Sequence, residues 1–439
     1  MVKEEADFFS CEKDRFQNLL LIILHNPVII SAFCCAVLIY SGLFVPRIKN
    51  AFVSLMKLSA VKTAEGFIVS NPSKVIAGDS YFCDFEATAV CSGTGFRSQA
   101  HGNIRLLIPS SIIESLYPQK LYSLSGGSGG FLLDKGAYVS FSGSLSERGT
   151  FFVVEKVDSC IWNDSLVGKI LHFRALCRLQ LRRLLCAWGK AGGLLLALLS
   201  GCREYTEENL FFAFRDAGLS HILALSGMHL TLIGGIVLFW GTKLLGKKSS
   251  QLLLIFFIIF FVWFAGASPS LFRAFLYSLV YFLCYILHIR KPSGLQVLCL
   301  VFLIHAYVFP EHLLQIAFML SYAALAGILI CSPVIKRLFL RFIIPLLKEP
   351  LAASVGAQLF TAPISLAFFG KIVPIGIIAT LAVSPLITVF LYIGLLGIAL
   401  CLFMPFLSEP FNGIMNMLYN IISHVVLFFA GFPAFCLGM

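Results

Sequence analysis

The chain has 439 residues, of which 59% are hydrophobic and only 13% are charged, and its mean hydropathy is +0.90. Soluble chains have about 25% charged residues, so this composition excludes a cytosolic enzyme and a disordered chain and predicts a membrane protein with several spans. The net charge of +11 suits contacts with either nucleic acid or anionic lipid and does not discriminate between them.

The N-terminal part is predicted to contain a tail, an anchor and a soluble domain. Residues 1–18 are polar and form the tail, and the apolar run 19–45 lacks a cleavage pattern, so we interpret it as a retained transmembrane anchor. Residues 46–165 alternate polar and apolar side chains as strands do. The predicted strands are 65–70, 81–90, 103–108, 138–145 and 151–157. They predict a small, OB-like β-barrel.

Three of the 14 cysteines lie in this polar stretch: Cys83, Cys91 and Cys160. Two of them could pair if the domain faces an oxidising compartment, and the sequence does not indicate which two. No CxxC pair occurs anywhere in the chain, which argues against a zinc or redox site.

Residues 166–190 are predicted to form a basic amphipathic helix that lies on a membrane surface. Its arginines recur at helical spacing: Arg174, Arg178, Arg182 and Arg183. Two interpretations stay open. The arginines could anchor the helix to lipid headgroups, or they could contact the phosphates of a nucleic acid.

Residues 191–439 are almost wholly apolar and are predicted to form a multi-span channel domain. The candidate segments are 191–201, 219–240, 251–265, 269–289, 294–309, 313–332, 338–347, 351–369, 372–403 and 410–436. Several are shorter than the roughly 20 residues of a full span, which predicts half-helices or re-entrant pieces. Prolines are expected to break helices in the last third at Pro333, Pro345, Pro363, Pro374 and Pro385.

Positive charge in short loops predicts the orientation. The basic loops contain Lys243, Lys247 and Lys248, then Arg290 and Lys291, then Lys336, Arg337, Arg341 and Lys348. Two segments separate each pair of loops, so all three fall on one side, which the positive-inside rule makes cytoplasmic. The β-domain is then extracytoplasmic and the N-terminus is cytoplasmic.

Polar side chains are densest between Phe214 and Leu230. Ser226 and His229 are three residues apart and share a helix face, and His221 lies two turns before His229. Gly227 offers a small surface that another helix or a substrate could approach. Because a polar group in lipid needs a partner or a wet cavity, these residues either join helices or line a hydrophilic passage.

A second polar group begins at Ser268 and Pro269, which predict a helix start. Arg273 then lies one turn into the membrane, where an arginine at the span centre costs about 2.5–3.5 kcal/mol. We expect it to face water or to pair with a carboxylate, and Asp216 is the nearest acid on the same side. Three more polar residues, for which packing or capping is the simpler interpretation, are Gln315, Ser321 and Gln358.

The stretch 221–229, His-Ile-Leu-Ala-Leu-Ser-Gly-Met-His, resembles the signature of the competence ComEC/Rec2 family. Residues 265–274 and 318–324 resemble two further stretches of that family in matching order, over about residues 190–400. The resemblance implies a bacterial inner-membrane conduit for single-stranded DNA, preceded by an OB-like domain. The residues that would either line it or hold its helices together are Asp216, His221, Ser226, Gly227, His229, Ser268, Arg273, Gln315, Ser321 and Gln358, and the four arginines of 166–190 are candidates for phosphate contacts.

The sequence departs from the family in two places. Residues 379–385 read Ala-Thr-Leu-Ala-Val-Ser-Pro, without the usual asparagine before this stretch. Full-length members often end in a metallo-β-lactamase-like domain, which needs an HxHxDH cluster, and no two histidines here are two residues apart. We therefore expect no enzyme activity, metal or cofactor in this chain, and a separate nuclease, DNA receptor and cytoplasmic helicase as partners.

Two other functions stay open. One is transport of another polar or anionic solute. The other is an intramembrane serine hydrolase built on Ser226, but His229 shares its helix and Ala224 stands where a GxSG motif has glycine.

Overall fold

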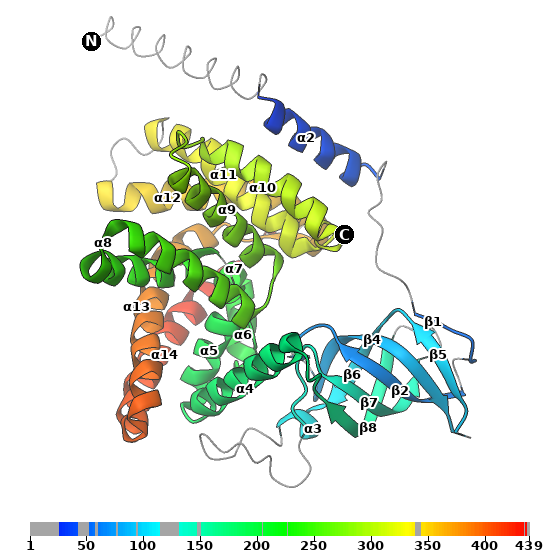
Figure 1. Ribbon diagram of the computed structural model, residues 1–439. Coiled ribbons are helices and arrows are strands. Elements are labelled where there is room, and N and C mark those ends of the chain that lie inside the picture. The colour runs from blue at the N-terminus through cyan, green and yellow to red at the C-terminus, as the bar shows by residue number, and fades with distance from the viewer. Residues whose placement is uncertain are drawn as a thin grey trace, which may run out of the picture.

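The computed structural model describes residues 26–42, 52–57, 60–75, 78–93, 95–114, 131–146, 151–203, 205–225, 227–338, 344–433 and 435–436. The predicted tail 1–18, the start of the predicted anchor and Ser226 lie outside these ranges. Figure 1 shows a small β-barrel at one side of a larger helical part, with helix α4 (Leu166–Cys186) between them.

The barrel is a closed ring of five strands. They are β2 (Val61–Ile68), β4 (Ser80–Ser92), β6 (Asn103–Pro109), β7 (Tyr138–Leu145) and β8 (Phe151–Ile161). The ring order is β4-β2-β7-β8-β6, and β6 pairs back to β4; the β6–β8 pair is parallel and the others are antiparallel. Short strands β1 (Val53–Ser54), β3 (Ser73–Lys74) and β5 (Arg97–His101) extend it, and α3 (Ser110–Glu114) follows β6. The predicted strands and the small OB-like barrel are thus confirmed.

Alternating burial along each strand fills the barrel, as a period of two requires. Its centre holds fully buried aromatic rings at Tyr81, Phe85, Phe141 and Phe152. Register shifts occur next to Gly66 and Gly143, where a Cβ would collide with a carbonyl oxygen of the neighbouring strand. Cys83, Cys91 and Cys160 are all free thiols in the structure.

The helical part contains both long and short helices. They are α2 (Pro27–Tyr40), α5 (Gly189–Ser200), α6 (Glu208–Asp216), α7 (Ser220–Leu223), α8 (Gly227–Ala265), α9 (Pro269–Ile286), α10 (Gly294–Val308), α11 (Ile316–Leu338), α12 (Pro345–Phe369), α13 (Gly376–Phe403) and α14 (Ser408–Ala430). Among the described residues, six are long and apolar enough to cross a membrane: α8, α9, α11, α12, α13 and α14. This confirms a polytopic helical membrane protein with a barrel domain.

Helix α8 is folded back on itself. Gly246 has φ 79° and ψ 170°, a left-handed conformation that favours glycine, and it divides α8 into arms 227–245 and 247–265. The arms pack closely, since a Cβ on Gly241 would lie 3.1 Å from the Cβ of Ser250. The predicted division between segments 219–240 and 251–265 is therefore confirmed, although the turn is tighter than expected.

The expectation that prolines break helices was largely wrong. Pro333, Pro363 and Pro385 lie inside α11, α12 and α13, which continue through them. In a membrane bundle, neighbouring helices and small local adjustments satisfy the freed carbonyl groups. Pro345 occupies the first turn of α12, where a proline costs no hydrogen bond, and Pro374 precedes α13.

Helix α5 lies at the centre of the helical part. Every residue from Ala191 to Ser200 is buried. Its neighbours in the same hydrophobic core come from α4, α8, α13 and α14. Helix α2 instead packs against α10, and its Ala32 and Ile39 belong to a second hydrophobic core that includes residues of α10. Two polar motifs of the sequence, at residues 214–229 and 265–274, begin where helices of this central group start or end.

Candidate functional site

The stretch from Phe214 to His229 is not one helix. Helix α6 ends at Asp216, Gly218 turns the chain with φ 72°, α7 has four residues, and Ala224 is extended before α8 begins at Gly227. His221 and His229 therefore lie on different helices, which corrects the prediction that they share one. His229 is fully buried, whereas His221 is exposed.

Three of the polar motifs meet around Arg273. Its Nη1 donates to the backbone oxygen of Ser321 in α11 at 2.7 Å, and its guanidinium lies 5.9 Å from the ring centre of Tyr322. On the other side lies Gly227, where an added Cβ would be 3.6 Å from Arg273 Nη2 and 3.2 Å from the Cβ of Ala274. The first turn of α8 thus approaches α9 through its glycine, as the sequence suggested for a small surface.

Asp216 does not pair with Arg273, which corrects the predicted ion pair. Its Oδ1 accepts from Lys371 Nζ at 2.8 Å and from Arg215 Nε at 3.2 Å. Partial burial would raise the pKa of Asp216, but these hydrogen bonds and charges hold the pKa below its ordinary value. The carboxylate is therefore charged at neutral pH and fixes the end of α6 to the chain before α13.

Gln358 supports the chain that packs against that same turn. Gln358 in α12 donates to the backbone oxygen of Val373 at 2.9 Å. A Cβ on Gly218 would lie 3.2 Å from the Cα of Gly376, so two glycines bring α13 against the turn after α6. Gln358 thus acts on the site through the backbone that carries Lys371 and Val373, in agreement with the simpler interpretation of packing.

Two buried polar atoms at or just before the start of α9 have no hydrogen-bond partner among the described residues. They are the Nε of Arg273 itself and the Oγ of Ser268, which precedes α9 without capping it. A donor left unpaired inside a membrane protein costs free energy unless it faces water or a ligand. Both atoms belong to the start of α9, which packs against α8 and α11.

A chain of hydrogen-bonded rings extends from this point. His305 Nδ1 lies 3.1 Å from the hydroxyl of Tyr322, and His305 Nε2 lies 3.0 Å from His312 Nδ1. Sequence analysis missed His305; the available signal was its spacing of seven residues from His312. Gln315 is exposed. Its backbone N–H donates to the backbone oxygen of His312 at 3.0 Å, and its own backbone oxygen accepts from the first turn of α11.

The four arginines of α4 are buried, and only 2–4% of the surface of each residue is exposed. Arg174 donates to Trp263 O at 2.6 Å and to Asn71 Oδ1 at 2.9 Å, and Arg178 donates to Asp134 Oδ2 at 3.0 Å and to Phe264 O at 3.1 Å. The prediction that α4 presents Arg174, Arg178, Arg182 and Arg183 on a membrane surface was wrong. Arg174 and Arg178 instead join the barrel to the end of α8, while Arg182 lies 3.6 Å from the Sγ of Cys202.

The arginines of this junction stabilise the charged form of Asp134. Burial alone would raise the pKa of Asp134, but Arg178, Arg182 and Arg174 together hold the pKa below its ordinary value. Burial also lowers the pKa of Arg174 to about 10. Asp134 and Asn71 were missed by sequence analysis, because neither stands out among the polar residues of the barrel.

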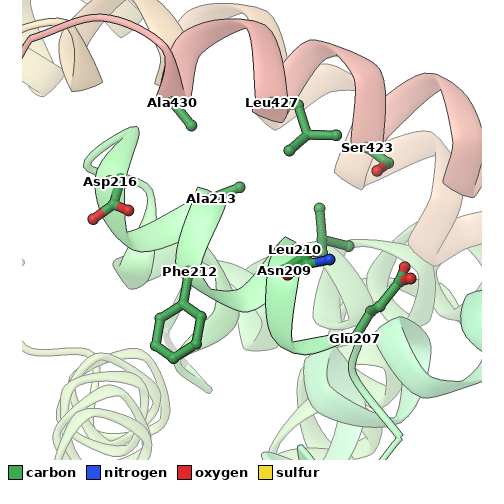
Figure 2. A pocket seen from close by; sticks show the side chains of 9 residues that line it. All are labelled: Glu207, Asn209, Leu210, Phe212, Ala213, Asp216, Ser423, Leu427 and Ala430. Atoms are coloured by element: carbon green, nitrogen blue, oxygen red, sulfur yellow. The ribbon is translucent and has the colours of Figure 1, made fainter.

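A hollow of about 550 Å³ lies between α6 and α14. Figure 2 shows Ser423 and Leu427 of α14 facing Leu210 of α6, with Glu207 and Asp216 at opposite ends. Glu207 accepts from Lys190 at 2.8 Å and from Tyr419 at 2.7 Å. Carboxylates at both ends make this hollow a poor surface for a polyanion.

The described part of the chain contains no group of three or more His, Cys, Asp or Glu side chains that could hold a metal ion.

Comparisons with known proteins place these motifs in a family. A family model described as "Competence protein" matches residues 198–439, which is more than half of the chain. ComE operon protein 3 of Bacillus subtilis (strain 168) is 27% identical over 197 residues, covering 45% of this chain and 25% of that protein. The chain thus matches about a quarter of the length of this curated relative. No solved structure matches.

Proposed function

The chain belongs to the competence protein family, and from this premise we propose that it forms part of an inner-membrane conduit that passes single-stranded DNA into the cytoplasm during natural transformation. The relative named above is a ComE operon protein, which supports a role in DNA uptake. The match covers only part of that protein, so the transported cargo, the partner proteins and the identity of the membrane are all parts of the proposal.

One observation carries it: Arg273 lies where α8, α9 and α11 meet, and its buried Nε has no hydrogen-bond partner among the described residues. The Oγ of Ser268, just before the same helix, is likewise without a partner there. A polyanion needs a positive, hydrated lining to pass through an apolar bundle. No acidic residue occurs between Asp216 and Glu311, so α8, α9 and α10 add only positive or neutral groups to this part of the bundle.

The buried junction of α4 changes one part of the predicted path. Arg174 and Arg178 are occupied with Asp134 and with backbone oxygens, so in this structure they hold the barrel in place. The proposal assigns the DNA-facing role to Arg273, Ser268 and Gly227 and leaves the α4 arginines to structural support. The proposal also puts the barrel outside and the N-terminus inside, and the basic loops that contain Lys247 and Arg290 support this orientation. A separate nuclease, DNA receptor and helicase complete the proposed machinery.

The test is uptake of labelled DNA by cells that lack this chain and are complemented with variants. Arg273→Gln should insert normally and reduce internalised single-stranded DNA by at least about tenfold, the effect of losing about 1.4 kcal/mol of interaction along the path. Arg290→Gln is the matched control, since Arg290 is exposed just after the same helix. Immunoblots of membrane fractions report the amount of each variant.

Two results would contradict the proposal. One is normal DNA uptake in cells without the chain, which would remove the conduit itself. The other is undiminished uptake with Arg273→Gln at normal abundance, which would remove Arg273 from the lining. A fluorophosphonate that labels Ser226 stoichiometrically would favour a hydrolase in place of a conduit.

A further inference from the structure

The tip of the α8 hairpin combines positive charge with an apolar groove. Each arm has 19 residues and is therefore about 28 Å long, close to the thickness of a hydrocarbon core. The turn at Gly246 thus falls where one membrane surface is expected. Lys243, Lys247 and Lys248 flank this turn, and all three are exposed.

Among the residues that the structure describes, none is a carboxylate partner of these lysines. None of the ion pairs among the described residues includes Lys243, Lys247 or Lys248. The sequence also supplies no acid nearby, since none occurs between Asp216 and Glu311. Three uncompensated cations within six residues at a membrane surface attract an anionic group.

A groove of about 330 Å³ runs between the two arms next to the lysines. Its lining contains only apolar side chains and one glycine, among them Val237 and Trp240 of the first arm and Leu253 and Phe256 of the second. Trp240 is 56% exposed and Phe256 is 68% exposed, so the groove opens away from the bundle. A surface of this kind accepts a hydrocarbon chain.

The charge and the groove are joined at Trp240. The Nζ of Lys243 lies 5.9 Å from the ring centre of Trp240 and 4.3 Å from that of Phe239, within the range of cation–π contacts. Trp240 also lines the groove. A ligand with an anionic head and an acyl tail could therefore meet the lysines and the groove at once.

We propose that the tip of the α8 hairpin is a binding site for an anionic phospholipid of the bilayer, with its phosphate at Lys243, Lys247 and Lys248 and an acyl chain between the arms. The site lies at the Gly246 end of the two arms, whereas Gly227 and Ala265 lie at their other end. The proposal does not depend on the function proposed above. A second basic loop, at Arg290 and Lys291, supplies a natural comparison.

The experiment uses the full chain in zwitterionic phospholipid vesicles that contain a small fraction of lipid with brominated acyl chains, which quench tryptophan fluorescence on contact. The signal of Trp240 is the difference between the wild-type protein and Trp240→Phe. We expect brominated phosphatidylglycerol to quench this signal more strongly than brominated phosphatidylcholine at equal fraction.

Variants locate the effect. Replacing Lys243, Lys247 and Lys248 together by Gln should reduce the preference for the anionic lipid at least about fivefold, which is the change expected for one lysine near a charged lipid surface. Replacing Arg290 and Lys291 by Gln should leave it unchanged. The proposal is overturned by equal quenching from both lipids, by a preference that survives the triple change, or by equal losses in both variants, which would indicate general charge attraction.

Discussion

Arg178 of α4 donates from Nε to Oδ2 of Asp134 at 3.0 Å, and both side chains are almost completely buried. The same guanidinium donates from Nη1 to the backbone oxygen of Phe264, in the last turn of α8. One side chain therefore connects the barrel, α4 and α8. A pivot of the barrel would expose or break a buried ion pair, so the barrel and the hairpin are expected to move as one unit.

Replacing Asp134 with Ala should strongly destabilise the protein. It would leave Arg174 and Arg178 buried without their carboxylate, and breaking a buried pair from one side costs about 3–5 kcal/mol. Asp84→Ala is the control, because its partner Arg105 is 3.5 Å away and both are exposed, so we expect a change of about 0–1 kcal/mol. Thermal unfolding of the purified protein in detergent measures both. Equal midpoints would contradict the role of the junction.

The junction should also make stability depend on acid. The pKa of Asp134 is lower in the folded protein than the value of about 3.9 of an unfolded chain. Its charged form therefore contributes stability that is fully present above about pH 4 and is lost as the pH falls through the folded-state pKa. Melting curves between pH 7 and pH 3 should show this loss in wild type, and Asp134→Asn should show less of it. Parallel curves for the two proteins would argue against the assignment.

Gly227 is expected to tolerate no larger side chain. A Cβ there lies 3.2 Å from the Cβ of Ala274, so Gly227→Val must push α8 from α9 at a cost of about 1–3 kcal/mol. Gly235→Val is a matched control on the same arm, since a Cβ there meets nothing within 4 Å. The unfolding midpoint and DNA uptake should both fall for Gly227→Val alone. A comparable fall with the control would assign the effect to helix propensity.

The hydroxyl of Tyr322 is hydrogen-bonded to His305, and its ring lies beside the guanidinium of Arg273. Two substitutions separate the contributions of these two contacts to stability. Tyr322→Phe removes the hydrogen bond at 3.1 Å and should cost about 0.5–1.5 kcal/mol. Tyr322→Leu also removes the ring beside the guanidinium and should cost more. Tyr307→Phe, at a residue 89% exposed, should change nothing measurable. The measurement is again the unfolding midpoint, and equal effects of Phe and Leu would show that the ring contributes little.

Much of the architecture could be predicted from local patterns. Period-two alternation located the five barrel strands, and apolar runs located the long helices, because both depend on side chains near in sequence. The break at Ala224 was not predictable in this way, since the run from Leu219 to Trp240 reads as one apolar segment. The predicted helix breaks at Pro333 and Pro385 were wrong for a related reason. The free energy that a proline costs inside a helix depends on neighbouring helices, which the local sequence does not show.

The partners of charged residues were harder to predict than their importance. Arg273 was predicted to face water or to pair with a carboxylate. Its Nη1 instead donates to the backbone oxygen of Ser321, a partner that no pattern of side chains in the sequence indicates. The arginines of α4 have the spacing of a surface helix, yet they are buried because Asp134 and the end of α8 satisfy them. Amphipathic spacing indicates a polar face and does not indicate whether that face meets solvent or another part of the protein.

The complete enclosure of α5 has a consequence for biogenesis. Residues 191–200 contact α13 and α14, which are synthesised about 200 residues later, and they retain no lipid-facing surface in the finished molecule. We therefore expect this short helix to reach its buried position only after α13 and α14 have been synthesised. Ribosome-stalled chains ending before α13 should keep α5 open to cysteine crosslinking, and complete chains should protect it.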